Sequence, residues 1–526
     1  MIWHIFTKDA RLLWPIAALV AVLQVCAAIP QHLIDHGIRT TQLAMLADLL
    51  PGLALLGIMV MVVVVMQQDP IPGARQDWLI RPIRRRDLAV AKLLFVLLMV
   101  LAPLWVVAVG AALADGFALR AAGAAAAARN LQVLCLFALP AMVLGALTRT
   151  FVEALIVTIV VFVGFIGIVQ FVITGLLGLD QSLGDTGVAW LFFAAFDVLA
   201  LAGSAAALAI LHSGRRTILA RLLTGVAVAL LISVLSVPWP LAFSMQAALS
   251  PQPTASRAIT VAFDPQAGRY RAPVGAASTG ASTLHVPLRF SDLPEDASVL
   301  MDRADIRIMG LDGATLYVGK STRSFDGRTM SDDRFEVRAG RDDPQVHSVD
   351  ERIFLPPEVL ARLADRPVRM AIDYSLTLFG PAGTYSLPTT SARKLYPGLG
   401  RCRTGIDAEG DDVSIGCLST ARQPPCVTAY LEYPPTGLRN PESHFCERDY
   451  APALIAKFWP DAIHRVGGEV RFYDFLGMVR FPVDGSKVAA ARLIIKTYDV
   501  RDHFTRHVDT PLVRLAELTA LAVPPP

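Results

Sequence analysis

Seven long apolar stretches in the first half of the chain constrain its fold more than any other feature. A helix needs roughly 20 apolar residues to cross the hydrocarbon layer of a bilayer, and roughly 17–25 are acceptable. Charges are confined to the flanks of the stretches, which core helices of a large soluble protein would not explain. The sequence therefore predicts an α-helical polytopic membrane domain over residues 12–244, with about seven transmembrane helices. The stretches are 12–30, 49–66, 93–114, 131–147, 154–178, 188–211 and 222–243, of which 131–147 is the weakest because it is short and contains Pro140.

The distribution of charge divides the chain into two parts. Residues 1–249 contain 15 Lys and Arg and 11 Asp and Glu, whereas the other 277 residues contain 33 and 34. The second half therefore has the composition of an ordinary water-exposed domain. A net charge of +3 without a basic stripe outside the membrane-flanking loops gives no reason to expect a nucleic-acid partner.

Lys and Arg predict the orientation, because cytoplasmic loops carry an excess of them. With the N-terminus inside, the inner loops contain twelve basic residues and the outer loops contain three, namely Arg39, Arg120 and Arg129. An odd number of crossings then makes the second half extracytoplasmic. A cleaved signal peptide over residues 1–30 is the alternative for the first stretch, but six further stretches follow it.

Four cysteines support an exported second half. Cys402, Cys417, Cys426 and Cys446 lie within 45 residues, and an even, clustered set is typical of an oxidising compartment. Four cysteines allow three pairings, and we expect the sequence neighbours, 402–417 and 426–446, to form disulfides. The alternative is four free thiols in a cytosolic domain. Their spacing does not fit a zinc ribbon, so no metal site is predicted.

The exported part reads as a mainly-β domain. Residues 245–283 are interpreted as a linker and first strand, and residues 284–526 as a β-rich domain that resembles a sandwich. Alternating apolar residues predict strands near 259–263, 306–308, 335–337, 370–376, 427–433 and 493–498. One short helix is predicted at 356–364 and a second near 451–458.

The chain contains no catalytic motif that we can identify. Residues 314–321 read ATLYVGKS, where Ala314 replaces the first glycine of a phosphate-binding loop. His503 and His507 are four residues apart, but Phe504 stands where a helical zinc motif has Glu, so they are interpreted as surface residues near a strand end. We therefore expect no enzymatic activity and no bound cofactor in this chain.

Two polar features belong to the membrane domain. Residues 1–11 predict an interfacial amphipathic helix, with His4, Lys8 and Arg11 on its polar side. Asp197 lies near the middle of the sixth stretch, where a carboxylate costs about 2.5–3.5 kcal/mol, so it should face protein or water. It marks either a transport pathway or a satisfied packing contact.

A cytoplasmic loop completes the pattern. Residues 69–94 read DPIPGARQDWLIRPIRRRDLAVAKLL. Together with the N-terminal helix and the first six stretches, this loop resembles ABC-2 type transporter permeases over about residues 1–212. The resemblance implies a permease subunit in the bacterial cytoplasmic (inner) membrane, with a second permease chain and a separate ABC ATPase that binds ATP and Mg²⁺. It also implies that the 69–92 loop couples to that ATPase through Asp77, Trp78, Arg81, Pro82, Arg84, Arg85, Arg86 and Asp87.

The sequence leaves more than one function open. Export is favoured over import by the resemblance, and the substrate is not specified. The seventh stretch and the long C-terminal half depart from the six-helix family pattern. The main alternative is a membrane-anchored extracytoplasmic binding or sensor protein, and an anchored enzyme is a weaker one.

Overall fold

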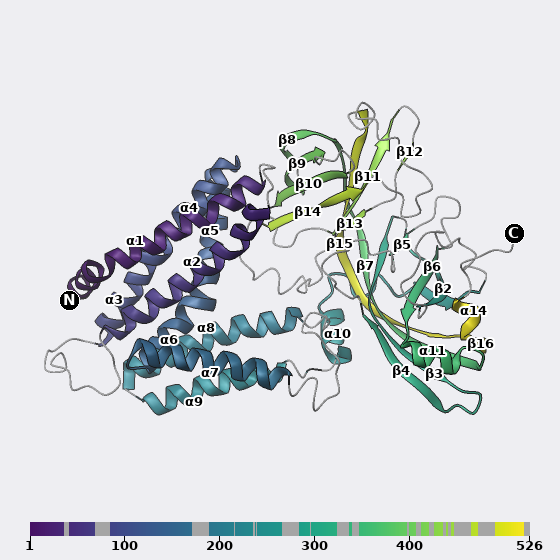
Figure 1. The fold of residues 1–526 in the computed structure, drawn as a ribbon, viewed down its shortest axis with the longest axis horizontal. Coiled ribbons are helices and arrows are strands. Elements are labelled where there is room, and N and C mark those ends of the chain that lie inside the picture. Colours follow the sequence, from purple (N-terminus) through teal and green to yellow (C-terminus); the bar gives the residue numbers. More distant parts are fainter. Residues whose placement is uncertain are drawn as a thin grey trace. The chain divides into compact units, whose positions relative to one another are not determined.

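The chain forms two compact units. A helical unit lies within residues 1–237, and a β unit begins at Pro238 (Figure 1). The computed structural model describes residues 1–35, 41–68, 85–170, 189–214, 216–234, 237, 239–265, 283–294, 296–322, 336–338, 347–396, 399–406, 412–419, 426–434, 438–439, 443–445, 464–471 and 490–519.

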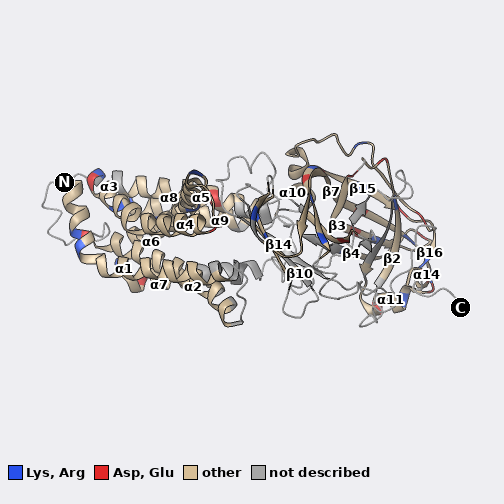
Figure 2. Cartoon of the chain, turned by 90° about the horizontal axis from the view of Figure 1, so that it is seen from above, with Lys and Arg blue, Asp and Glu red and all other residues tan. Residues whose placement is uncertain are grey.

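The helical unit consists of long apolar helices in which charged residues are sparse (Figure 2). Two helices contain a π-helical stretch: η2 (Val96–Leu101) joins α3 to α4, and η3 (Leu134–Ala138) joins α5 to α6. The helices are α1 (Ile2–Asp35), α2 (Thr41–Gln67), α3 (Arg85–Phe95), α4 (Ala102–Ala114), α5 (Leu119–Val133), α6 (Leu139–Leu147), α7 (Phe151–Gln170), α8 (Ala189–Gly214) and α9 (Thr217–Val234).

Five helices in the described residues are long and apolar enough to cross a membrane. They are Ile2–Pro30, Met45–Gln67, Arg86–Ala114, Leu119–Leu147 and Ala194–Leu211, and two shorter apolar helices cover Phe151–Val160 and Thr217–Leu231. The stretch at 131–147, predicted to be the weakest, is the second half of a 29-residue helix. The chain is therefore a multi-pass membrane protein.

The prediction of one span over residues 222–243 is wrong. Helix α9 ends at Val234, and a separate helix, α10 (Trp239–Ala248), belongs to the β unit. Pro240 lies in the first turn of α10. Backbone N–H groups of a first turn have no hydrogen-bond partner within the helix, so proline, which lacks an N–H, is tolerated there. The apolar residues Trp239, Ala242 and Phe243 are buried within the β unit, which explains why a hydropathy window cannot tell them from a membrane segment.

Close helix contact is visible where α6 meets α2. A Cβ atom at Gly145 would lie 2.8 Å from Cβ of Met66 and 2.9 Å from the carbonyl oxygen of Val63. Gln67 Nε2 donates to Thr148 Oγ1 at 2.9 Å near the same ends of the two helices. A small residue at this position lets the two backbones approach, as is common between membrane helices.

The β unit is built around an antiparallel sheet in the order β12-β11-β15-β7-β3-β4. Its strands are β3 (Ser298–Met309), β4 (Thr315–Thr322), β7 (Pro367–Pro388), β11 (Cys426–Tyr433), β12 (Leu438–Arg439) and β15 (Arg492–Asp509), and the short strands β5 (Glu336–Arg338), β13 (Ser443–Phe445) and β16 (Val513–Arg514) pair with β3, β11 and β7. This sheet agrees with the predicted mainly-β second half.

Two smaller sheets complete the unit. One has the order β1-β2-β6, formed by β1 (Thr260–Phe263), β2 (Thr283–Ser291) and β6 (His347–Phe354). The other has the order β14-β10-β9-β8, formed by β8 (Ser391–Tyr396), β9 (Gly400–Ile406), β10 (Asp412–Ser419) and β14 (His464–Arg471). Helices α11 (Pro357–Leu363) and α14 (Leu515–Thr519) are short.

Each small sheet shares a hydrophobic core with a different part of the central sheet. Leu288 and Phe290 of β2 are buried with Ile306 of β3 and Ile372 of β7 in the first core. The second core combines residues of β9 and β10 with Leu387 of β7 and with Leu493 and Ile495 of β15. The 22-residue strand β7 and the 18-residue strand β15 therefore run through both cores.

Several sequence predictions for this half are confirmed. Strands β1, β3, β5, β7, β11 and β15 lie where the alternating patterns indicated, and α11 lies within the predicted 356–364 helix. Residues 245–248 are instead the end of α10, and residues 250–259 are attached to β15, so this part of the predicted linker is not a free connector. The helix predicted near 451–458 lies outside the described residues.

Candidate functional site

A buried ion pair joins the first turns of α1 to α3. Lys92 Nζ donates to Asp9 Oδ2 at 2.8 Å, and the two side chains are 2 % and 0 % exposed. Lys8 Nζ lies 3.6 Å from Asp9 Oδ1, but its side chain is half exposed. Ile5 of α1 packs with Leu88 and Ala91 of α3 in a small hydrophobic cluster between the same two helices. Burying two charges is costly unless they are paired at close range, so the pair fixes α1 against α3.

Asp9 was not among the residues singled out from the sequence. It lies within the apolar stripe of α1, four residues after Ile5 and four before Leu13, both of which are buried. An acidic residue within such a stripe signals a buried partner, because a lone buried carboxylate would be strongly unfavourable. Its partner is 83 residues away, which a local pattern does not reveal.

The residues predicted for the interfacial helix lie on the exposed side of α1. No break separates residues 1–11 from the span at 12–30, so the predicted helix is the beginning of α1. His4, Lys8 and Arg11 are exposed, and so is Trp3, whose ring centroid lies 5.0 Å from that of Phe6. This part of α1 therefore has a basic and aromatic outer side and an apolar side packed on protein.

The predicted coupling loop is partly described. Arg85, Arg86 and Asp87 form the first turn of α3, in which Arg86 is exposed and Asp87 half-buried. Asp77, Trp78, Arg81, Pro82 and Arg84 lie outside the described residues. Residues 85–92 of the predicted 69–92 loop belong to α3, so this part is helix and not loop, and the ion pair at Lys92 lies about one and a half turns after Asp87.

Further polar residues lie among the apolar helices. Both side-chain polar atoms of Gln24 are buried and have no hydrogen-bond partner within the described structure. Asn130 Nδ2 donates to the carbonyl of Leu101 at 2.6 Å, at the end of η2. The predicted intramembrane residue Asp197 is half-buried in α8, and no ion pair to it occurs among the described residues.

One predicted disulfide is present in the β unit. Cys402 of β9 and Cys417 of β10 lie directly opposite each other, with Cα atoms 4.0 Å apart, and are bonded. Cys426 begins β11, whereas Cys446 lies outside the described residues. The second pairing, 426–446, remains a prediction.

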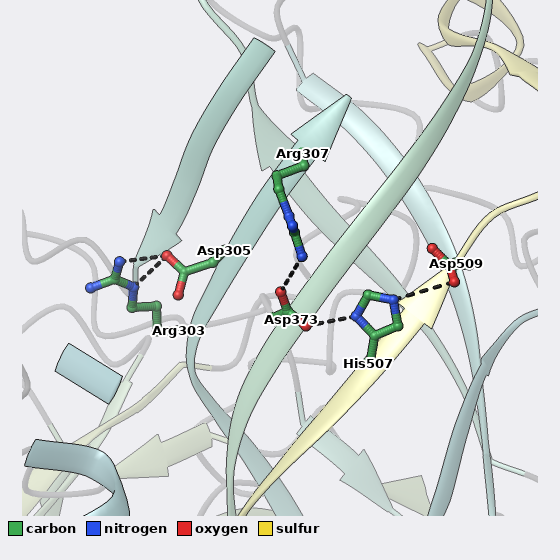
Figure 3. Close-up of polar contacts among 6 residues, drawn as sticks. All are labelled: Arg303, Asp305, Arg307, Asp373, His507 and Asp509. Atoms are coloured by element: carbon green, nitrogen blue, oxygen red, sulfur yellow. Dashed lines mark hydrogen bonds and ion pairs between the residues drawn. The ribbon is translucent and has the colours of Figure 1, made fainter. Parts of the chain in front are cut away.

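Charged side chains gather on one face of the central sheet (Figure 3). Asp305 of β3, Asp373 of β7 and His507 of β15 are aligned in register. Like charges directly opposite each other destabilise a sheet, and neighbouring cations offset this repulsion. Arg303 Nε donates to Asp305 at 2.8 Å, and Arg307 donates to Asp373 at 3.0 Å.

His507 lies between two carboxylates (Figure 3). Its Nδ1 lies 2.6 Å from Asp373 Oδ1, and its Nε2 lies 3.3 Å from Asp509 Oδ2. The hydrogen bond to Asp373, with a further contribution from Asp509, raises the pKa of His507 above its ordinary value. The side chains of His507 and Asp373 are half exposed, so the ion pairs of Asp373 lie on a water-accessible surface.

His503 has the opposite environment, although it lies on the same strand and face. It is 4 % exposed, and burial lowers the pKa of His503 to about 4. The sequence interpretation of His503 as a surface residue is therefore wrong, because α10 covers it; His507 is exposed, as expected. Among the described residues, no group of three or more His, Cys, Asp and Glu could hold a metal ion.

Comparisons with known proteins return no relative. No family model, no curated protein and no solved structure matches the chain.

Proposed function

We propose that this chain is the membrane-spanning permease subunit of a transporter driven by a separate ABC ATPase. The observation that carries the proposal is the buried Asp9–Lys92 pair, which joins the N-terminal turns of α1 to the helix that follows the 69–84 loop. A force applied to that loop would reach two long apolar helices together. The basic and aromatic outer side of α1 and the exposed Arg86 offer the groups that are enriched at protein interfaces.

In this proposal the ATPase contacts the cytoplasmic ends of α1 and α3 and the loop between α2 and α3. Nucleotide binding and hydrolysis on the ATPase then shift the permease between inward- and outward-facing states. The chain itself holds no ATP. A second permease chain completes the path, α7 and α9 complete seven crossings, and the sandwich-like β unit lies outside the cytoplasm.

The test is isolation of the native complex. The tagged chain is purified from membranes of its own host into nanodiscs, and the partners are identified by mass spectrometry. We expect an ATPase subunit at a fixed ratio to the chain. Replacing Trp78 and Arg81 with Ala should lower ATPase recovery at matched expression, whereas Arg129→Ala, predicted on the other side of the membrane, should not.

A second candidate is a membrane-anchored sensor that works through its β unit. The specific observation in its favour is the pair of histidines on β15, which have oppositely shifted pKa values within four residues. Absence of any ATPase from the wild-type preparation would refute the transporter proposal and favour the sensor.

A further inference from the structure

Helix α10 is docked on the central sheet by aromatic and polar contacts. Trp239 Nε1 donates to Ser375 Oγ of β7 at 3.0 Å, and the indole ring lies under the guanidinium of Arg303, 5.6 Å from its centroid. Phe243 stacks on Trp239 and meets the edge of His503, with centroids 6.0 Å apart. Ala242 is fully buried on this side, and its neighbour Leu241 is exposed.

His503 forms the polar centre of this contact. Its Nδ1 lies 2.9 Å from Ser250 Oγ, and its Nε2 lies 3.0 Å from Gln246 Nε2. Ser250 Oγ also accepts the backbone N–H of His503 at 3.0 Å. Since an amide nitrogen only donates, the arrangement fits a neutral ring with its proton on Nδ1. If Nε2 of His503 were also protonated, its N–H would point at the amide N–H of Gln246. Flipping the Gln246 amide would give this proton an acceptor, but the positively charged ring would still be buried.

Among the described residues, no carboxylate forms an ion pair with His503. The segment 239–256 has no titratable side chain. The charged groups of the neighbouring strands have other partners: Asp302 accepts from Thr377, Arg303 pairs with Asp305, Asp373 binds Arg307 and His507, and Asp502 accepts from Ser256. The protonated ring would therefore be both desolvated and uncompensated.

We propose that α10 is an acid-released latch, in which protonation of His503 detaches the helix from the sheet. The latch stands independently of the transporter proposal. Helix α10 follows α9, the last apolar helix of the helical unit, after only residues 235–238. Release of α10 would lengthen that connection between the membrane part and the β unit.

The direction and size of the effect follow from linkage. His503 has a lowered pKa when docked, about 4, against an ordinary 6.5 when released. The contribution of neutral His503 to docking is therefore fully present well above pH 6.5 and is lost as the pH falls from 6.5 toward 4. Between pH 7 and pH 5 the released ring, with a pKa of 6.5, becomes protonated, whereas the docked ring, with a pKa of about 4, stays mostly neutral. The docking equilibrium constant should therefore fall by about 20-fold over this range.

Paired cysteine probes in the full chain test the latch. Ala242→Cys reports the buried side of α10 and Leu241→Cys its exposed side, in a background with Cys26 and Cys135 replaced by Ala. The rate of maleimide labelling at 242 is divided by that at 241, which cancels the effect of pH on thiolate formation. This ratio should rise about 20-fold from pH 7 to pH 5 and stay constant when His503→Asn is added.

A third probe separates release of α10 from unfolding. Ala429→Cys lies in the second core and is fully buried. Labelling at 429 should stay slow at pH 5 while labelling at 242 accelerates. A 242-to-241 ratio that is unchanged by pH, an equal rise in the His503→Asn variant, or parallel labelling at 429 would each overturn the latch.

Discussion

Replacement of Lys92 by Met tests whether the buried pair holds α1 to α3. Met keeps the apolar stem of Lys92 and removes the ammonium group that lies 2.8 Å from Asp9. Asp9, fully buried, would then lose its close, buried partner and keep only the half-exposed Lys8 at 3.6 Å among the described cations that pair with it. Removing one partner of a buried pair typically costs about 3–5 kcal/mol, which corresponds to a more than hundredfold increase in the unfolding equilibrium constant.

Lys8 provides the matched control. It is adjacent to Asp9 in sequence and 3.6 Å from the other carboxylate oxygen, but its side chain is half exposed. Lys8→Met should therefore cost less than about 1 kcal/mol, as exposed pairs do. Asp9→Leu combined with Lys92→Met removes both charges and should be much less harmful than Lys92→Met alone, since apolar replacements of buried pairs are often tolerated.

The assay is the free energy of unfolding of the purified chain, measured by titration of dodecyl sulfate into lipid–detergent micelles. Wild-type, Asp9→Leu, Lys92→Met and the Asp9→Leu/Lys92→Met double substitution form a double-mutant cycle, from which the coupling energy is obtained, and Lys8→Met is measured beside them. A loss of less than about 1 kcal/mol for Lys92→Met would refute the reasoning. So would equal losses for Lys92→Met and Lys8→Met.

Three further predictions concern packing, the disulfide and topology. Gly145→Ala should destabilise the helical unit by about 1–3 kcal/mol, because its Cβ would meet the backbone of α2. Gly110→Ala, with open space around it, should be neutral or slightly stabilising. Thermal unfolding of both variants measures the difference. Alkylation of the unreduced chain followed by mass analysis should leave Cys402 and Cys417 unlabelled, and labelling of both would contradict the disulfide. A reporter active only outside the cytoplasm should be active when fused after residue 300 and silent after residue 86, and the reverse pattern would refute the orientation.

Hydropathy predicts most of the helical unit, because a membrane helix depends mainly on a continuous apolar run. It fails where apolar residues are buried by distant protein instead of lipid. Trp239 and Phe243 continue the apolar run of α9, but the residue that binds Trp239 is 136 positions away on β7. No window of 20 residues contains that information.

The same limit applies to the candidate sites. The basic residues of α1 and α3 are visible in the sequence, but the pairing of Asp9 with Lys92 depends on how two helices pack. His503 and His507 look equivalent by spacing, and period-two alternation places both on one face of β15. Their different environments arise because α10 covers one of them, an arrangement that depends on contacts between residues 253–257 positions apart.

The attachment of residues 250–259 to β15 has a consequence for how the β unit is made. Ser256 Oγ donates to Asp502 at 2.6 Å, and Arg506 Nε donates to the carbonyl of Ile259 at 2.7 Å, so partners are 246 and 247 residues apart. At about 5–20 residues per second of synthesis, roughly 12–50 seconds separate their emergence from the ribosome. Until then β7 and β11 each have an open edge where β15 belongs. The unpaired edges of β7 and β11 must therefore be protected until β15 has been synthesised. A chain that is interrupted before residue 492 should be degraded by proteases.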